Sequence, residues 1–419
     1  VLKIVRFSAF AVFASTFALA FASALRAADV NGTSEKFRAP EPLRDLGRTN
    51  KVRLAYFVPA NREPTPNYAE KIRVLTTFVA DLYREDFRAK KLEADGPDFV
   101  FQDRAPLVHL VRSTNNAAWF SGDPDFNVNR QWDRIVPEIE RSLGSLRTNL
   151  YVVFCETYSD GPAKWEWPGG FALGGRTTAT GGAGLFSSWI LRDEFCATNV
   201  ARQLELLDDT TPIKGRIALH PRKMDSPRFE FIEDGFGAVA HELGHALGLP
   251  HDTRRDDVSI MGNGFRYLRY NYLRRFDAKP RVGFSDEEAR FLRFTRFLGR
   301  DIDLTDNVEP RFTLTFPNRL DVGATEIPVT ISGEDDRALG AFLVFDPVRD
   351  TVIGGEELSG TKMKKEIRIR VPPLKEGPIK LRLLFTDRSG NQVAARIQTK
   401  AEPKPVEPKP EAKPAEKTK

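Results

Sequence analysis

Cysteine and histidine are both scarce in this chain, which has 2 Cys and 5 His among 419 residues. Two cysteines cannot hold a chain of this length together, so a small disulfide-rich fold is excluded. With 41% hydrophobic and 29% charged residues, the composition is that of a globular protein. It excludes a fully disordered, collagen-like or multi-span membrane protein. After residue 28 no apolar run is long enough to span a bilayer.

A large excess of charge of one sign is also missing. The formal net charge is +5, and three of the positive charges (Lys3, Arg6 and Arg26) lie in the first 28 residues, which contain no acid. The remaining chain therefore carries about +2, which is too little to favour a phosphate backbone. We expect no nucleic-acid partner.

Residues 1–28 have the features of an export signal peptide. A basic start is followed by an apolar stretch from Phe7 to about Ala24, and Ala22-Ser23-Ala24 fits a cleavage site. The alternative is an uncleaved membrane anchor, because an apolar stretch of roughly 18 residues is near the lower limit for a span. We therefore expect a secreted, periplasmic or cell-surface protein.

Export bears on the two cysteines. An oxidising compartment allows Cys155 and Cys196 to form a disulfide, and a free exposed thiol would be a liability there. We therefore expect the pair to be bonded. The alternative is two separate buried thiols.

The first half of the chain predicts alternating strands and helices. Residues 29–48 are polar and form a loose lead-in. Beyond them, β-branched and aromatic runs predict strands, and apolar residues at helical spacing predict helices. The expected elements are a strand at 51–59, a helix at 68–92, strands at 99–101 and 107–111, a helix at 129–146 and a strand at 150–154. This order predicts an α/β sheet with right-handed crossovers.

A glycine-rich segment, residues 169–184, follows this sheet. It contains no phosphate-binding loop, and it is either a flexible loop or an irregular edge strand where another backbone approaches closely. Residues 216–219 predict a short strand, and residues 234–247 a helix that Asp234 caps. Ser285 and the acids after it predict a capped helix that ends near residue 298.

Residues 308–400 predict a separate all-β sandwich. Short alternating runs are divided by turn residues, and Asp387 to Asn391 resembles the hairpin of bacterial immunoglobulin-like modules. Residues 401–419 repeat Glu-Pro-Lys-Pro units and predict a disordered tail. Two roles for this tail are open: a spacer, or a segment that associates with the cell envelope.

Residues 241–252, His-Glu-Leu-Gly-His-Ala-Leu-Gly-Leu-Pro-His-Asp, contain three of the five histidines. His241 and His245 are four apart on a helix and therefore face the same side. Gly248 permits a turn with positive φ, which lets His251 point back at them. Three imidazoles suit a zinc site with an open position for water. Glu242 lies beside this face, where it can serve as the general base for zinc-activated water.

This pattern closely resembles the metzincin clan of zinc endopeptidases, whose motif is H-E-x-x-H-x-x-G-x-x-H followed by a methionine turn. The resemblance implies that the three histidines are zinc ligands, that Glu242 is the general base and that Met261 forms the methionine turn. It covers residues 49–300 and implies an α/β (α+β) zincin-type domain with a mixed sheet and a catalytic helix. An edge strand of such a domain binds substrate backbone, and residues 170–186 are expected to supply it.

The subfamily is left open by the same residues. Asp252 after the third histidine is similar to the adamalysins, whereas Ala246 to His251 is more similar to the matrixins. No cysteine precedes Cys155, so the thiol latch of matrixin zymogens is absent from this sequence. Asp252 is expected to support its loop by bonding local backbone amides. No Asp-rich loop with calcium-ligand spacing stands out, and the need for calcium is unknown.

The sequence therefore predicts an exported zinc endopeptidase that acts on protein or peptide substrates. The alternative is a surface binding or adhesion protein, in which the immunoglobulin-like sandwich binds the partner and the metal site is vestigial. A degenerate site would have lost Glu242 or a ligand, and neither is lost. A cell-wall peptide or a small amide is also open as the substrate.

Overall fold

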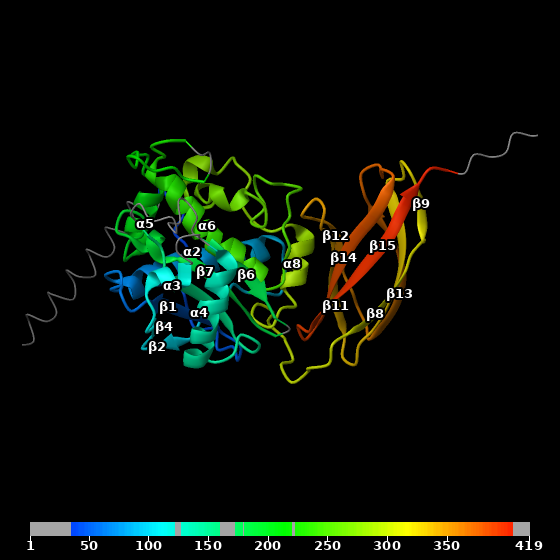
Figure 1. Ribbon diagram of the computed structural model, residues 1–419, viewed down its shortest axis with the longest axis horizontal. Coiled ribbons are helices and arrows are strands. Elements are labelled where there is room, and N and C mark those ends of the chain that lie inside the picture. Colours follow the sequence, from blue (N-terminus) through cyan, green and yellow to red (C-terminus); the bar gives the residue numbers. More distant parts are fainter. Residues whose placement is uncertain (1–34, 122–126, 160–171, 179, 220–222, 405–419) are drawn as a thin grey trace, which may run out of the picture. The chain divides into compact units, whose positions relative to one another are not determined.

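The computed structural model describes residues 35–121, 127–159, 172–178, 180–219 and 223–404 (Figure 1). They form two compact units, which divide between Ile302 and Asp303. The expected signal peptide lies outside the described residues, as do His220 and the tail from residue 405. No helix in the described ranges has both the length and the apolar character needed to cross a membrane.

A five-stranded mixed sheet forms the centre of the first unit, in the order β4-β1-β5-β7-β6. The first four of these strands run parallel, and β6 pairs antiparallel with β7 at one edge. Every residue of β5 and β7 is buried, which is typical of central strands covered on both faces. The predicted mixed sheet is confirmed. The strands are β1 (Val52–Val58), β4 (Val108–Arg112), β5 (Leu150–Cys155), β6 (Ala172–Thr177) and β7 (Gly182–Ser187), with a small hairpin of β2 (Phe101–Gln102) and β3 (Ala105–Pro106).

The helices are α2 (Tyr68–Ala89), α3 (Ala117–Ser121), α4 (Val128–Leu143), α5 (Val200–Leu207), α6 (Arg228–Ala246), α7 (Arg269–Tyr272) and α8 (Asp286–Leu292), with short 3₁₀ turns η1 (Ser188–Leu191), η2 (Gly264–Tyr267) and η3 (Arg274–Phe276). The four predicted helices occur in the predicted order with different ends, and α3, α5 and α7 were not predicted. The capping box of Ser285 and Glu288 at the start of α8 is confirmed. The helix itself ends at Leu292, earlier than predicted.

Two predictions near α6 are wrong. The helix begins at Arg228, and Asp234 lies inside it rather than at its cap. The Asp234 carboxylate instead accepts hydrogen bonds from the Leu219 backbone N–H (2.8 Å) and from Arg266 Nε (3.0 Å). Residues 216–219 form no strand, since Ile217 makes only an isolated bridge to Met224.

The predicted disulfide is also wrong. Cys155 and Cys196 are both free and buried. The Cys155 thiol lies near the Val153 carbonyl oxygen at 3.8 Å, and the Cys196 thiol near that of Lys71 at 3.5 Å. Burial raises the pKa of both thiols, which keeps them protonated and unreactive. A disulfide is not needed to protect thiols that solvent does not reach.

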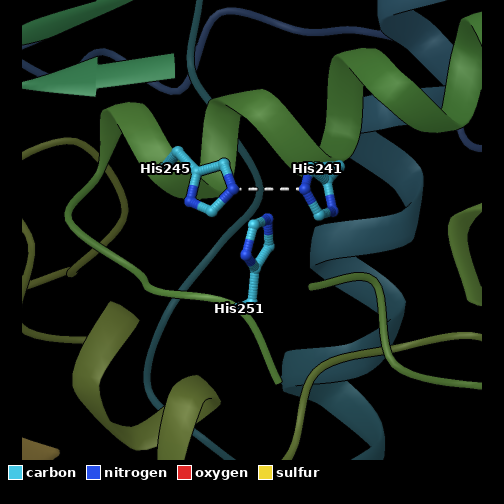
Figure 2. A group of neighbouring side chains, drawn as sticks. All are labelled: His241, His245 and His251. Atoms are coloured by element: carbon cyan, nitrogen blue, oxygen red, sulfur yellow. Dashed lines mark hydrogen bonds between the residues drawn. The ribbon is translucent and has the colours of Figure 1, made fainter. Parts of the chain in front are cut away.

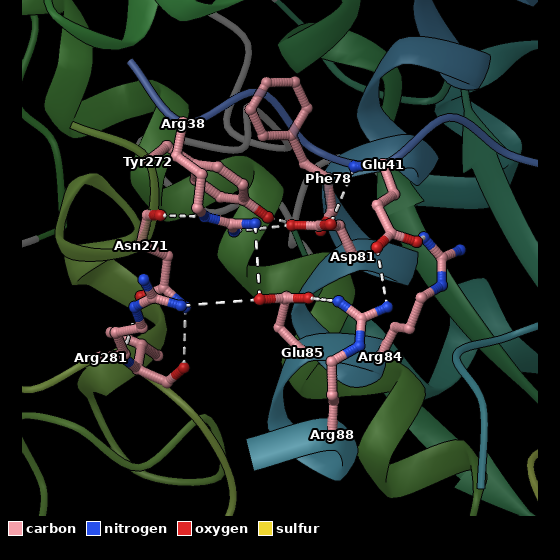
Figure 3. A network of polar contacts seen from close by, with 11 residues as sticks. Arg38, Glu41, Phe78, Asp81, Arg84, Glu85, Arg88, Asn271, Tyr272 and Arg281 are labelled. Carbon is pink, nitrogen blue, oxygen red and sulfur yellow. Dashed lines mark hydrogen bonds and ion pairs between the residues drawn. The ribbon is translucent and has the colours of Figure 1, made fainter. Parts of the chain in front are cut away.

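The described part of the lead-in, residues 35–48, is fixed along α2 rather than loose (Figure 3). Arg38 donates to the Asp81 carboxylate at 2.7 Å and to the Asn271 carbonyl oxygen at 2.7 Å. The other Asp81 oxygen accepts the Glu41 backbone N–H at 2.9 Å. Asp81 is fully buried, so these contacts compensate a charge that would otherwise be costly to bury.

The second unit is all-β, as predicted. A three-stranded sheet has the order β13-β10-β8, and a five-stranded sheet the order β12-β11-β14-β15-β9. Apolar side chains from both sheets pack into one core, including Val329 of β10 and Phe385 of β14. The strands are β8 (Arg311–Thr315), β9 (Arg319–Asp321), β10 (Glu326–Glu334), β11 (Leu339–Asp346), β12 (Thr351–Glu357), β13 (Lys362–Arg370), β14 (Gly377–Asp387) and β15 (Gln392–Glu402).

We predict that Asp81→Ala lowers the free energy of unfolding by about 3 kcal/mol, because it leaves the Arg38 guanidinium without its buried partner. Chemical denaturation of the purified chain measures this change. Asp45→Asn is the matched control, since Asp45 is exposed and contacts only the nearby Lys51 and the Gly47 backbone N–H among the described residues. Its effect should be much smaller. Equal losses in the two variants would contradict a structural role for the lead-in.

Candidate metal centre

Three histidines come together at the end of α6 (Figure 2). His241 and His245 lie four apart on one face of the helix. Gly248, with φ of 102°, then turns the chain, so that His251 approaches the same face from the following loop. One ring nitrogen of each histidine lies within 4.8 Å of the other two. The structure thus gathers the three residues that the spacing predicted.

Hydrogen bonds to backbone carbonyls fix two of the imidazoles. His241 Nδ1 lies 2.7 Å from the Ile260 carbonyl oxygen, and His245 Nδ1 lies 2.7 Å from that of Leu249. A carbonyl oxygen only accepts, so each Nδ1 must carry the proton. In the neutral rings each Nε2 is then a bare lone pair. Both lone pairs are directed at the place where the three rings meet.

The spacing of the two Nε2 atoms fits a metal ion. They lie 3.1 Å apart, and two unprotonated nitrogens cannot hydrogen-bond to each other. Four ligands placed tetrahedrally at the usual Zn–N distance would be about 3.3 Å apart. Burial, and then the neighbouring His245, lower the pKa of His241 well below its usual range, which favours the neutral form that binds metals. The donor set therefore suits a cation that prefers nitrogen ligands.

Glu242 lies where the helix meets the edge strand β6. Burial raises the pKa of its carboxyl group to about 7, and a hydrogen bond from the Gly175 backbone N–H opposes this rise. The contact requires glycine in the strand, because a Cβ atom at Gly175 would lie 2.0 Å from the Glu242 carbonyl oxygen. Helix and strand backbones therefore touch directly, and the carboxylate lies beside β6, the outermost described strand of the sheet.

The loop below the histidines is tied together by Met261 and Asp252. The Asp252 backbone N–H donates to the Met261 carbonyl oxygen at 3.0 Å. Met261 is fully buried against the helix at Gly244, where a Cβ atom would lie 2.4 Å from the Met261 sulfur. The Asp252 carboxylate accepts from the Arg254 backbone N–H at 3.1 Å and from its guanidinium at 2.6 Å. These contacts agree with the loop-supporting role expected of Asp252.

Sequence reasoning missed two neighbours of the site. Phe265 packs against the His241 ring with centroids 4.9 Å apart, and nothing in its local sequence marks it. Gly175 places an N–H at Glu242, and here the Gly174-Gly175 pair was a usable signal for close backbone approach. Within the glycine-rich segment, Ala172–Thr177 form the expected edge strand, whereas the residues from Gly182 onward belong to β7, an inner strand of the sheet.

Comparison with known proteins gives matches at the level of family and fold. A family model described as "Putative peptidase family" matches residues 129–282. The chain is similar to OgpA from Akkermansia muciniphila, in a catalytically inactive form bound to an O-glycopeptide (glycodrosocin) substrate, with a TM-score of 0.54, 13% identity and coverage of 87% of this chain and 96% of that chain. Wild-type OgpA gives a TM-score of 0.55 at 13% identity, with the same coverage of both chains. No curated protein matches the sequence significantly.

These findings confirm the predicted resemblance to a metallopeptidase and the predicted fold class. The family model supports a metallopeptidase-type hydrolase. The OgpA structures, at 13% identity, show that the fold is shared across both units. The metal, the base and the metzincin subclass stay predictions.

We predict that Gly175→Ala lowers the free energy of unfolding by about 1–3 kcal/mol, because the added methyl group forces β6 away from α6. Chemical denaturation measures the change. Gly354→Ala is the matched control in a strand of the second unit, since a Cβ atom there meets nothing within 4 Å. A Gly175→Ala variant as stable as Gly354→Ala would refute the direct contact between helix and strand.

Proposed function

We propose that this chain is an exported, zinc-dependent endopeptidase of the metzincin type. The observation that carries the proposal is the convergence of three imidazoles, two of them with Nε2 directed at a common point, beside the Glu242 carboxylate. The turn at Gly248 and the buried Met261 beneath the helix support the metzincin assignment. The family match supports peptide-bond hydrolysis.

The residues around the site divide the chemistry between them. His241, His245 and His251 would hold the zinc ion, which when bound would supply Lewis acidity to polarise a carbonyl group and acidify water. The Glu242 carboxylate accepts the proton of the attacking water and delivers it to the leaving amine. Its hydrogen bond from Gly175 holds it toward β6. The outer edge of β6, with which no other described strand pairs, is suited to align an extended peptide by backbone hydrogen bonds.

We predict that Glu242→Gln lowers the rate of peptide hydrolysis about 10²–10⁴-fold, because the amide cannot accept the proton. Bound zinc, measured by atomic absorption, should remain near one ion per chain. Glu205→Gln is the matched control, since Glu205 is exposed on α5 and pairs with Arg202. It should hydrolyse at the wild-type rate. Hydrolysis by Glu242→Gln at that rate would contradict the proposed base.

Zinc dependence is tested in the same assay. A chelator should abolish hydrolysis by the wild-type chain, and stoichiometric zinc should restore it. His245→Ala should lose both zinc and activity, since it removes one of the three nitrogen donors. Full activity after complete zinc removal would refute the metal-dependent mechanism.

A glycopeptide is a second candidate substrate, which we infer from a polar surface hollow together with the OgpA neighbour that binds an O-glycopeptide. The hollow combines amide, hydroxyl and guanidinium groups with an aromatic ring, and its lining residues are Thr114, Asn115, Asn116, Ala118, Trp119, Arg130 and Arg134. Trp119 is 50% exposed, and the Arg134 guanidinium lies 3.6 Å from its ring centroid. Next to Arg130 on α4, Asn129 accepts a hydrogen bond at 2.9 Å from Arg176 of β6. The hollow is thereby connected to the proposed peptide-binding edge.

We predict that Trp119→Ala lowers kcat/KM for an O-glycosylated peptide about tenfold, because a sugar that covers the exposed indole would gain about 1.4 kcal/mol. The unmodified peptide of the same sequence should be cleaved at an unchanged rate. Measuring both peptides with both proteins gives the comparison. An equal loss for the two peptides would contradict a glycan subsite at Trp119.

A further inference from the structure

Three aspartates meet at one end of the second unit, although they are far apart in the sequence. Asp306 lies in the segment before β8, whereas Asp335 and Asp336 follow β10 in its connection to β11. One carboxylate oxygen of each lies within 4.8 Å of the other two. Like charges at such distances repel, and this arrangement is unfavourable without a compensating cation.

Asp335 carries a separate indication of a ligand. Its side chain is only 8% exposed. Its Oδ1 accepts the Arg337 backbone N–H at 2.9 Å, and the Ala338 backbone N–H also bonds the carboxylate, whereas the buried Oδ2 has no partner within 3.5 Å among the described residues. A buried carboxylate oxygen without a partner is costly, and native proteins rarely leave one unless an ion or water is bound.

The surrounding charges leave the cluster strongly negative. Asp387, at the end of β14, lies near Asp335 and Asp306. Burial, together with the repulsion of these two carboxylates, raises the pKa of the Asp387 carboxyl group to about 6. Its oxygens accept hydrogen bonds from Asn391 Nδ2 at 2.7 Å and from two backbone N–H groups. Asp387 therefore adds negative charge to the cluster, but both of its oxygens already have partners. Arg337 contacts the edge of the cluster, 3.9 Å from Asp336 and 3.0 Å from Asp303.

We propose that Asp306, Asp335 and Asp336 bind one calcium ion. All three ligands are carboxylate oxygens, which calcium prefers, and the group contains no imidazole or thiolate for zinc. Calcium bonds oxygen at roughly 2.3–2.6 Å, so one ion reaches ligand atoms that are up to about 5 Å apart. The buried Oδ2 of Asp335 gains the partner that the described residues do not provide.

The ion would join two segments of the second unit. It connects the chain just before β8 to the turn between β10 and β11, at the end of the sandwich where β14 also ends. This site is independent of the histidine centre, since it shares no residue with it. Its role is to stabilise the second unit rather than to take part in hydrolysis.

Equilibrium dialysis of the full-length, zinc-loaded chain against radioactive calcium tests the proposal. We expect one calcium per chain, retained in a tenfold excess of zinc and displaced poorly by magnesium. Calcium should also raise the unfolding temperature. Absence of bound calcium, displacement by zinc, or equal binding of magnesium would each overturn the assignment.

Two variants of equal charge locate the ion. Asp335→Asn should weaken calcium binding at least tenfold and remove the rise in unfolding temperature. Asp321→Asn should bind as the wild type does, because Asp321 pairs with Glu402, at the opposite end of β15 from Gln392. Asp336→Asn, checked by circular dichroism, provides a second ligand variant if Asp335→Asn does not fold. Wild-type affinity in a folded ligand variant would refute the site.

Discussion

Two hydrogen bonds from imidazole Nδ1 atoms to backbone carbonyls are the constraint on which the histidine site depends. They orient His241 and His245 and fix the tautomer that exposes each Nε2. Their acceptors, Ile260 and Leu249, lie in the loop that follows α6, so the loop must fold correctly before the rings can point together. The positive φ of Gly248 begins that loop, and the bond from Asp252 to Met261 closes it. The ligands are therefore oriented by the fold itself, which reduces the ordering that metal binding would require.

The contact between α6 and β6 orients the proposed base, Glu242, just as the two hydrogen bonds to backbone carbonyls orient the histidines. Gly175 allows the two backbones to touch, and its N–H reaches the Glu242 carboxylate. Since β6 is the edge of the mixed sheet, the base and the strand proposed to bind substrate are held at a fixed separation. A larger residue at Gly175 would disturb both at once. This explains why a glycine-rich strand, otherwise a poor strand former, occurs at this edge.

A structural feature can be predicted from the sequence when residues close to it in the chain determine it, and not when tertiary contacts do. The histidine cluster was predictable because helical geometry places residues four apart on one face, and a glycine and a proline end the helix in time for His251. The capping box at Ser285 and the hairpin turn from Asp387 to Asn391 are equally local. The disulfide was predicted wrongly because pairing of Cys155 with Cys196 depends on tertiary distance, and compartment chemistry alone does not supply it. Asp234 has the residue type of a helix cap, but tertiary bonds to Leu219 and Arg266 hold it inside a longer helix.

The acidic cluster shows why spacing rules find one kind of metal site and miss another. A helix places ligands together within a single turn, so the histidine motif is visible in eleven residues. In a β-sandwich, ligands come from loops that only the strand order brings together. Asp306 and Asp335 are separated by β8, β9 and β10, and each looks in the sequence like an ordinary turn aspartate that bonds a nearby backbone N–H. In Asp335 that local bond uses Oδ1, and the buried Oδ2 has no hydrogen-bond partner among the described residues. In this sandwich, the buried second oxygen of Asp335 therefore indicates the proposed cation site, which no spacing of residues in the sequence marks.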